Sequence, residues 1–219
     1  MARRTLPPPI ELPTPAVAAL EPLPGPLAAG GAYDGVELAD LDLTGVRAPD
    51  VTLLESAVRG GRWDQALLPG LRLTECVLKG VGATSLDVHD CAWRDVLVRD
   101  CRWGAVEAPG ADWSRVGVQG GRWDYLNLRG ATLAEVVLEG LTIGELDLGG
   151  ARVRRLAVRD CRIARLSLHG ATLEGVDLRG ADLAQVDQPA GLKGATISSS
   201  QAYELAAAFA AELGVRVAE

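Results

Sequence analysis

The sequence predicts an all-β solenoid built of five-residue units, and three regularities of the 219-residue chain support this prediction. Every fifth residue from Leu38 to Leu183 is apolar. The residue two positions before each of these is small or apolar throughout, except at Ser56. The residue two positions after is most often glycine or aspartate, as at Gly60 and Asp90, and both residue types favour turns. Each unit therefore supplies two inward-facing side chains followed by a corner.

A helix does not fit this spacing, because five residues rotate a 3.6-residue helix by about 500° and spread the apolar stripe around it. In a strand, side chains alternate between the two faces, so two inward positions separated by one outward position fit a short strand. A corner then resets the alternation once per unit. The register runs from residue 38 to residue 183 without an inserted loop.

The two ends of the chain depart from the register and define three segments. Residues 1–32 are rich in proline, which cannot donate to a strand ladder, and are predicted to form an extended N-terminal arm or cap. Residues 33–198 form the repeat region, in which the register breaks at Gln188-Pro189. Residues 199–219 are predicted to form a C-terminal helical cap, since the end of a solenoid exposes an open core and unpaired strand edges.

The predicted cap is an amphipathic helix from Gln201 to Leu213, preceded by serines and ended by Gly214. Its apolar residues are Tyr203, Leu205, Phe209 and Leu213.

Composition indicates a folded protein outside the membrane. The chain is 48% apolar and 23% charged, with a net charge of −7. It has no apolar run long enough to span a bilayer, and the prolines between Pro7 and Pro15 interrupt the N-terminus where a signal peptide would have its apolar core. We expect a cytoplasmic protein that does not bind a membrane.

The repeats resemble those of a known family. The units Gly170-Ala171-Thr172-Leu173 and Gly180-Ala181-Asp182-Leu183 match the A(D/N)LXX consensus of pentapeptide-repeat proteins, and the resemblance covers residues 34–187. It implies a right-handed quadrilateral β-helix in which four units form one square coil. Coils joined by backbone hydrogen bonds are spaced by about 4.8 Å.

The residues with reactive or aromatic side chains fall on inward positions. Cys76, Cys91, Cys101 and Cys161 lie in the small inward series, and none stacks on another in an adjacent coil, so we expect buried and reduced thiols. The five tryptophans lie in the central series, each with a small partner two residues earlier that makes room for the indole. They are Trp63, Trp93, Trp103, Trp113 and Trp123.

No arrangement of side chains predicts catalysis, a cofactor or a metal. His89 and His169 share one column but lie four coils apart, about 19 Å, which is too far for a proton relay or a shared metal ion. Acidic pairs, nucleophile–base sets and phosphate-binding loops do not rise above the repeat pattern. We therefore expect a protein that is not an enzyme.

Mapping outward positions at a period of twenty residues predicts three surfaces. The basic ridge comprises two neighbouring columns, Arg59, Lys79, Arg99, Arg159 and Arg179 in one and Arg62, Arg102, Arg122 and Arg162 in the other. The acidic columns are Glu55, Glu75, Asp95 and Glu135 in one and Asp87, Glu107 and Asp147, followed by Asp187, in the other. The apolar strip beside the ridge is Ala57, Val77, Leu97, Gly117, Val137 and Ala157.

The apolar strip has two interpretations. It is either a set of small residues covered by arginine stems or, with Val77, Leu97 and Val137 at its centre, an interface bordered by arginines. We expect a protein partner, and a homodimer formed through the C-terminal end or this strip is one form of it.

Two functions follow from these expectations. The first is a non-enzymatic protein-interaction scaffold. The alternative comes from the family resemblance, whose best-known members are acidic, DNA-shaped rods that bind DNA gyrase and confer resistance to quinolones or related topoisomerase poisons. The acidic columns favour this alternative and the basic ridge opposes it. Direct nucleic-acid binding along the ridge is disfavoured by the net acidity and by the absence of aromatic residues that we expect to be exposed.

Overall fold

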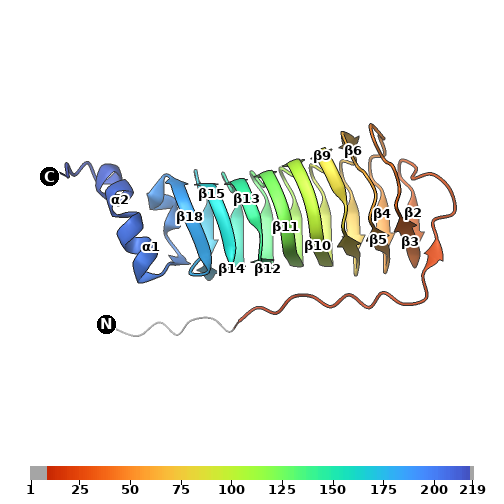
Figure 1. The fold of residues 1–219 in the computed structure, drawn as a ribbon, viewed down its shortest axis with the longest axis horizontal. Helices are drawn as coiled ribbons and strands as arrows, with labels where there is room; N and C mark the ends of the chain where they lie inside the picture. The colour runs from red at the N-terminus through yellow and green to blue at the C-terminus, as the bar shows by residue number, and fades with distance from the viewer. Residues whose placement is uncertain (1–8, 218–219) are drawn as a thin grey trace.

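The computed structural model describes residues 9–217 and shows a parallel β-solenoid of about eight turns, drawn as a rod in Figure 1. Along the rod each strand pairs with the strand about twenty residues later, as Trp93 does with Trp113 and Trp113 with Leu133. One turn therefore holds four five-residue units. The solenoid predicted from the five-residue register is confirmed. The coil of four units that the resemblance implies is confirmed as well.

The strands are short at the N-terminal end of the rod and longer in its middle. The two longest, β10 and β11, have 16 residues each and continue across a corner of the coil. The strands in chain order are β1 (Glu21–Pro22), β2 (Ala32–Asp34), β3 (Val36–Ala39), β4 (Thr52–Leu54), β5 (Ala57–Arg59), β6 (Ala66–Leu67), β7 (Arg72–Thr74), β8 (Val77–Lys79), β9 (Gly82–Asp87), β10 (Ala92–Glu107), β11 (Asp112–Asn127), β12 (Thr132–Glu139), β13 (Thr142–Asp147), β14 (Arg152–Arg159), β15 (Cys161–Ser167), β16 (Thr172–Glu174), β17 (Val176–Asp177), β18 (Ala181–Asp187) and β19 (Ala195–Thr196).

The core is a continuous column of leucine, valine and tryptophan side chains inside the coils. All five indoles are buried. Trp93 and Trp113 stack with ring centroids 4.8 Å apart and planes at 7°, while Trp103 and Trp123 lie 4.4 Å apart at 34°. The predicted placement of the tryptophans in the core is confirmed. Stacking follows from the twenty-residue register, which places successive tryptophans of one column one coil apart.

Ser56, the polar exception in the small inward series, lies at the start of the ladder. It is fully buried, and its hydroxyl oxygen accepts a hydrogen bond from the Val36 amide at 3.1 Å. The same hydroxyl donates to the Leu54 carbonyl at 2.6 Å. A serine is therefore tolerated here because it satisfies a backbone amide in the first coil.

The C-terminal cap consists of two short helices in place of the single predicted helix. A 3₁₀ turn, η1 (Pro189–Leu192), and β19 lead into α1 (Ser199–Glu204) and α2 (Ala206–Glu212). Ser198 caps α1 through a capping box with Gln201. The Gln201 side chain is buried and donates to the carbonyls of Leu178 at 2.7 Å and Ala181 at 2.6 Å. It thereby satisfies carbonyl groups of the last coil.

The predicted apolar face of the cap is only partly correct. Leu205 is buried and Phe209 is half-buried, but Tyr203 and Leu213 are exposed. Gln201, Leu205 and Phe209 lie four residues apart and form the stripe that faces the rod, whereas Tyr203 points about half a turn away from it. Leu213 is the residue that ends α2, beyond the last residue of the stripe that packs against the rod.

The N-terminal arm turns back along the rod before the first coil. Strand β1 pairs in parallel with β3, with the Glu21 amide donating to the Gly35 carbonyl at 2.9 Å. Just before β1, Ala19 has a positive φ of 54°, which turns the chain out of the strand direction. In Figure 1 the arm extends from this point beneath the solenoid toward the C-terminal end.

Candidate interaction surfaces

The apolar strip is covered by the chain's own N-terminal arm. Leu12 and Pro13 lie over Gly117, where an added Cβ would come within 2.7 Å of the Leu12 side chain and 2.8 Å of the Pro13 ring. Two coils further along, the Arg159 guanidinium donates a hydrogen bond to the Ile10 carbonyl oxygen. The arm therefore runs antiparallel to the progress of the coils, with its N-terminal residues near the later ones.

The length of the arm matches this course. From Glu21, which pairs with Val36, to Ile10, which meets Arg159, the arm has about eleven residues, and an extended chain of that length spans about 36 Å. The six coils between Val36 and Arg159 occupy about 29 Å. An extended arm is therefore long enough to cross the six coils, with only about 7 Å of chain length to spare.

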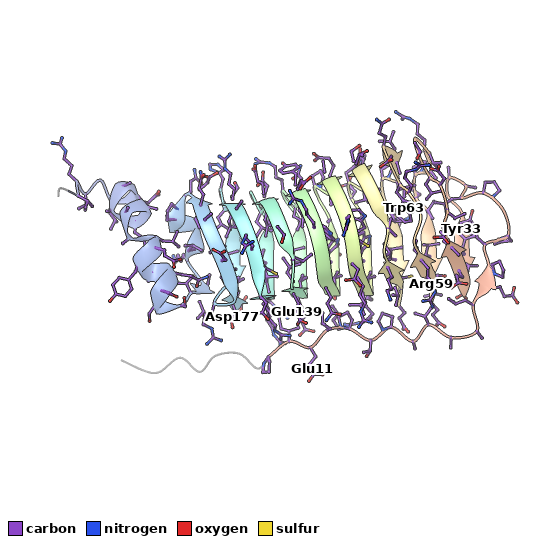
Figure 2. The ribbon with its side chains drawn as sticks, viewed as in Figure 1. Glu11, Tyr33, Arg59, Trp63, Glu139 and Asp177 are labelled. Atoms are coloured by element: carbon purple, nitrogen blue, oxygen red, sulfur yellow. The ribbon has the colours of Figure 1, made fainter. Side chains whose placement is uncertain are left out.

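Burial on both sides shows the same contact. In the strip, Leu97 is 3% exposed and Val137 is 0% exposed. In the arm, the half-buried residues are Ile10, Leu12, Pro13, Pro15 and Val17, and the exposed ones are Glu11, Thr14, Ala16 and Ala18. Figure 2 shows Glu11 on the side of the arm away from the coils. The arm is therefore amphipathic, with its aliphatic and proline side chains turned toward the strip.

Sequence reasoning found both the strip and the arm but did not connect them. The signal that could have joined them is the run of aliphatic and proline residues between Ile10 and Val17, broken only by Glu11 and Thr14, together with the agreement in length. No periodicity links an arm to the coils it crosses, because it lies across the strands and takes no part in their ladder.

The basic ridge is largely neutralised by neighbouring carboxylates. Arg59 pairs with Glu37, and Arg62 with Asp42 at 2.7 Å. The remaining pairs are Arg122–Asp124, Arg159–Glu139, Arg162–Asp182 and Arg179–Asp177. Within the described residues this leaves Lys79, Arg99 and Arg102 without an ion-pair partner, and they form the open cationic part of the ridge.

The carboxylates of the acidic columns are likewise paired with neighbouring arginine and asparagine side chains. In the first column Asp95 pairs with Arg115 and Glu135 with Arg155, each one coil apart. In the second, Asp87, Glu107 and Asp147 lie in register on one face, two of them separated by Asn127. Asn127 donates to Glu107 at 2.6 Å, and Arg129 pairs with Asp147 at 3.2 Å. The negative field of both columns is therefore weaker than the sequence columns alone indicate.

The arm lies between the first acidic column and the ridge. A surface hollow of about 500 Å³ is lined by arm residues 9–16 on one side and by Glu75, Asp95, Arg115, Glu135 and Arg155 on the other. The apolar strip thus has an acidic border on one side and a basic border on the other.

The histidines and cysteines are placed as the register predicts. The His89 Nδ1 atom lies 2.7 Å from Asp87 Oδ1, and the His169 Nδ1 atom lies 2.7 Å from Gln188 Oε1. Each histidine therefore has a separate hydrogen-bond partner. All four thiols are buried and free. Across residues 9–217 no group of three or more His, Cys, Asp or Glu side chains is placed to hold a metal ion. Within the same residues, neither α-helix has the length and apolar character needed to cross a bilayer.

The buried thiols predict a pH dependence of stability. Burial raises the pKa of Cys76 to about 11 and of Cys91 and Cys101 to about 12, from an ordinary value of 9.0. Between about pH 9 and pH 12 the unfolded chain loses these protons while the native state keeps them. This contribution to stability is therefore complete below pH 9 and declines as the pH rises through that window.

The expected result is a urea midpoint that falls from pH 9 upward, and less steeply in Cys91→Ala than in the wild type, since the variant lacks one such thiol. The native thiols should also fail to react with a thiol reagent near neutral pH and react fully in urea. Equal slopes for the two proteins would contradict the prediction.

The chain is similar to one family model over a short segment and to several solved structures at low identity. Residues 159–187 match the family model described as "Pentapeptide repeats (8 copies)". Among solved structures, a trypsin-treated QnrB1, a plasmid-mediated fluoroquinolone resistance protein, has a TM-score of 0.35 and 15% identity over 87% of this chain and 93% of its own. HetL, a pentapeptide repeat protein involved in heterocyst differentiation regulation in the cyanobacterium Nostoc sp. strain PCC 7120, has a TM-score of 0.29 and 18% identity over 78% of this chain and 91% of its own.

No curated protein is significantly similar to the chain in sequence. The two structural likenesses are too distant to bear on function. The family match at residues 159–187 lies within the five-residue register that builds every coil of the rod. Residues 159–187 therefore match the pentapeptide-repeat family model, and the coils on either side of them continue the same five-residue register.

Proposed function

We propose that this protein is a non-enzymatic scaffold that binds another protein. The observation that carries the proposal is a group of exposed apolar side chains at the C-terminal end of the rod. Tyr203 is 83% exposed, Leu213 78% and Val217 75%, and Val215 is also exposed. Elsewhere in residues 9–217 no large apolar side chain is comparably exposed. Exposed apolar side chains confined to one end of a molecule are typical of a protein interface.

We propose a second copy of the chain as the partner at this end, because a two-fold contact pairs the same exposed apolar side chains on both molecules. Light scattering on the eluted protein at micromolar concentration is expected to show a dimer for the wild type. The double variant Leu213→Glu/Val217→Glu is expected to be a monomer, since burying two carboxylates in an apolar contact is unfavourable.

The control is Ala184→Glu, which adds a carboxylate at an exposed position of β18 and should leave the dimer intact. A wild-type monomer at every concentration tested would contradict self-association through this end.

The register of Asp87, Glu107 and Asp147 on one face favours a second candidate, a DNA-mimicking protein that binds DNA gyrase or a related topoisomerase. A row of carboxylates would be attracted to the basic DNA-binding groove of such an enzyme. The hydrogen bond from Asn127 to Glu107 and the ion pair of Arg129 with Asp147 weaken that attraction, so the structure favours the scaffold over the DNA mimic.

A supercoiling assay with bacterial DNA gyrase, with and without a fluoroquinolone, tests this candidate. A DNA mimic is expected to inhibit supercoiling or protect the enzyme at micromolar concentration, and Asp87→Lys/Glu107→Lys is expected to abolish the effect. No effect of the wild type over that range would rule the candidate out.

A further inference from the structure

We propose that the apolar strip is a binding groove for an extended, proline-containing apolar peptide. In this proposal residues 9–22 are a tethered occupant of the groove, which such a segment of a partner protein replaces. The inference rests on the scaffold function proposed above and names the class of partner that the strip accepts.

The way the arm occupies the strip shows which peptide chemistry fits. The side chains of Leu12 and Pro13 lie over Gly117, and because glycine has no side chain, the strip has a depression at this position. Proline suits this position because the arm lies across the strands, so its backbone amides cannot join the ladder and their loss has no cost. Proline also holds the chain extended before it binds, which reduces the entropy lost on docking.

The arm is held at two ends, which makes its replacement feasible. Near its N-terminal end, Arg159 donates to the Ile10 carbonyl. At its C-terminal end the Glu21 and Leu23 amides donate to the carbonyls of Gly35 and Glu37 at 2.9 and 3.1 Å. Between these points the described contacts are apolar. A segment with the same spacing of aliphatic and proline residues can make the same contacts.

Charge restricts the partner further. Residues 9–22 carry two glutamates and neither lysine nor arginine. The strip is bordered by Lys79 and Arg99, which have no ion-pair partner within the described residues, and by Arg159. The expected segment is therefore apolar, contains proline and, like the arm, carries little charge, because a strongly charged segment of either sign would be repelled by one of the two borders of the strip.

The test measures whether the strip binds the arm sequence supplied as a separate peptide. A fluorescent peptide of residues 9–22 is titrated with the full-length wild type and with the full-length variant Ile10→Asp/Leu12→Asp, in which two inward-facing arm residues become charged. In the wild type the tethered arm competes at an effective concentration of about a millimolar or more. Fluorescence anisotropy is therefore expected to show binding to the variant that is at least about ten-fold tighter than to the wild type.

Two further proteins locate the binding site. Adding Val137→Asp to the arm variant places a carboxylate in the strip and is expected to abolish binding. Adding Thr132→Asp instead places it at an exposed position of the same strand, β12, and is expected to leave binding unchanged. Faster cleavage by elastase within residues 16–20, which are small and aliphatic and unchanged in the variant, shows that the arm has left the strip.

Two outcomes overturn the proposal. The first is an arm that is released, as the protease shows, from a strip that nevertheless fails to bind the peptide. The second is a wild-type dimer that the arm variant converts to a monomer, which would assign the strip to the arm of a second copy. The first result leaves the proposed function intact, since its test uses the C-terminal end of the rod. The second would move self-association from that end to the arm, and Leu213→Glu/Val217→Glu would then leave the dimer unchanged.

Discussion

Replacement of Trp113 by alanine is expected to lower the free energy of unfolding by about 4 kcal/mol. The Trp113 side chain is 0% exposed and stacks on Trp93 with ring centroids 4.8 Å apart. Alanine removes the stacking contact and leaves a cavity that neighbouring coils cannot fill, because their spacing is fixed by the strand ladder on every face. The change is measured as a shift of the urea midpoint at constant slope.

The matched control is Trp113→Phe. None of the five buried indole N–H groups has an oxygen or nitrogen acceptor within the described residues, and the Cys91 thiol beside Trp113 is only a weak acceptor. A buried donor without a good acceptor costs about 1–3 kcal/mol. Phenylalanine keeps most of the ring volume and removes that donor, so its net cost is expected to be below about 1.5 kcal/mol. Equal losses for alanine and phenylalanine would show that the N–H group, rather than the ring, holds the site together.

The interior of the rod could be predicted from the sequence almost residue by residue. Inward and outward positions are fixed by the alternation within a strand, and the corner resets it every five residues. The twenty-residue period then places Trp93 on Trp113 and Trp103 on Trp123, as observed. A strict local rule of this kind determines the core without knowledge of any long-range contact.

The surface could be predicted only as columns. The register places Asp95 and Arg115 one coil apart, but only the structure shows that the two side chains meet in an ion pair. The same holds for Glu135 and Arg155. Columns that seem strongly acidic or basic in the sequence are therefore closer to neutral in the folded protein, because long side chains reach the adjacent coil.

The two ends of the chain were the least predictable parts. The arm's docking joins residues about a hundred positions apart through apolar contacts that follow no repeat, as Leu12 does with Gly117. At the other end Gln201 is a polar residue in a predicted amphipathic helix, and nothing in the sequence distinguishes it from an exposed glutamine. Its burial depends on the carbonyls of Leu178 and Ala181, which only the last coil leaves open.

These features divide the rod into parts with different uses. The coils provide a rigid support held by a stacked core and a continuous ladder. The C-terminal end exposes apolar side chains such as Tyr203 and Leu213, whereas the N-terminal arm covers the apolar side chains of the strip. In the function proposed above, the exposed C-terminal end binds one partner directly, and the strip binds another only when the arm is displaced.

The backbone sets a second requirement at the small inward positions, and it predicts a large effect for Gly121→Ala. The sequence suggested that Gly61 and Gly121 are small to make room for Trp63 and Trp123. The structure gives a further reason, since both glycines have positive φ, 94° and 98° respectively. A Cβ at Gly121 would lie 2.2 Å from the Cys101 carbonyl oxygen, which is backbone of the preceding coil and cannot move without breaking the ladder.

Gly121→Ala is therefore expected to cost at least about 3 kcal/mol, from the strained backbone together with the displaced carbonyl. The matched control is Gly130→Ala, where φ is also positive, 67°, but nothing lies within 4 Å of the added Cβ. That change should cost only about 1 kcal/mol, the ordinary penalty for a side chain in the left-handed region. Both are measured by urea unfolding. If the two variants lose equal stability, contact between coils adds nothing at Gly121, and the position is small only because the neighbouring indole needs the space.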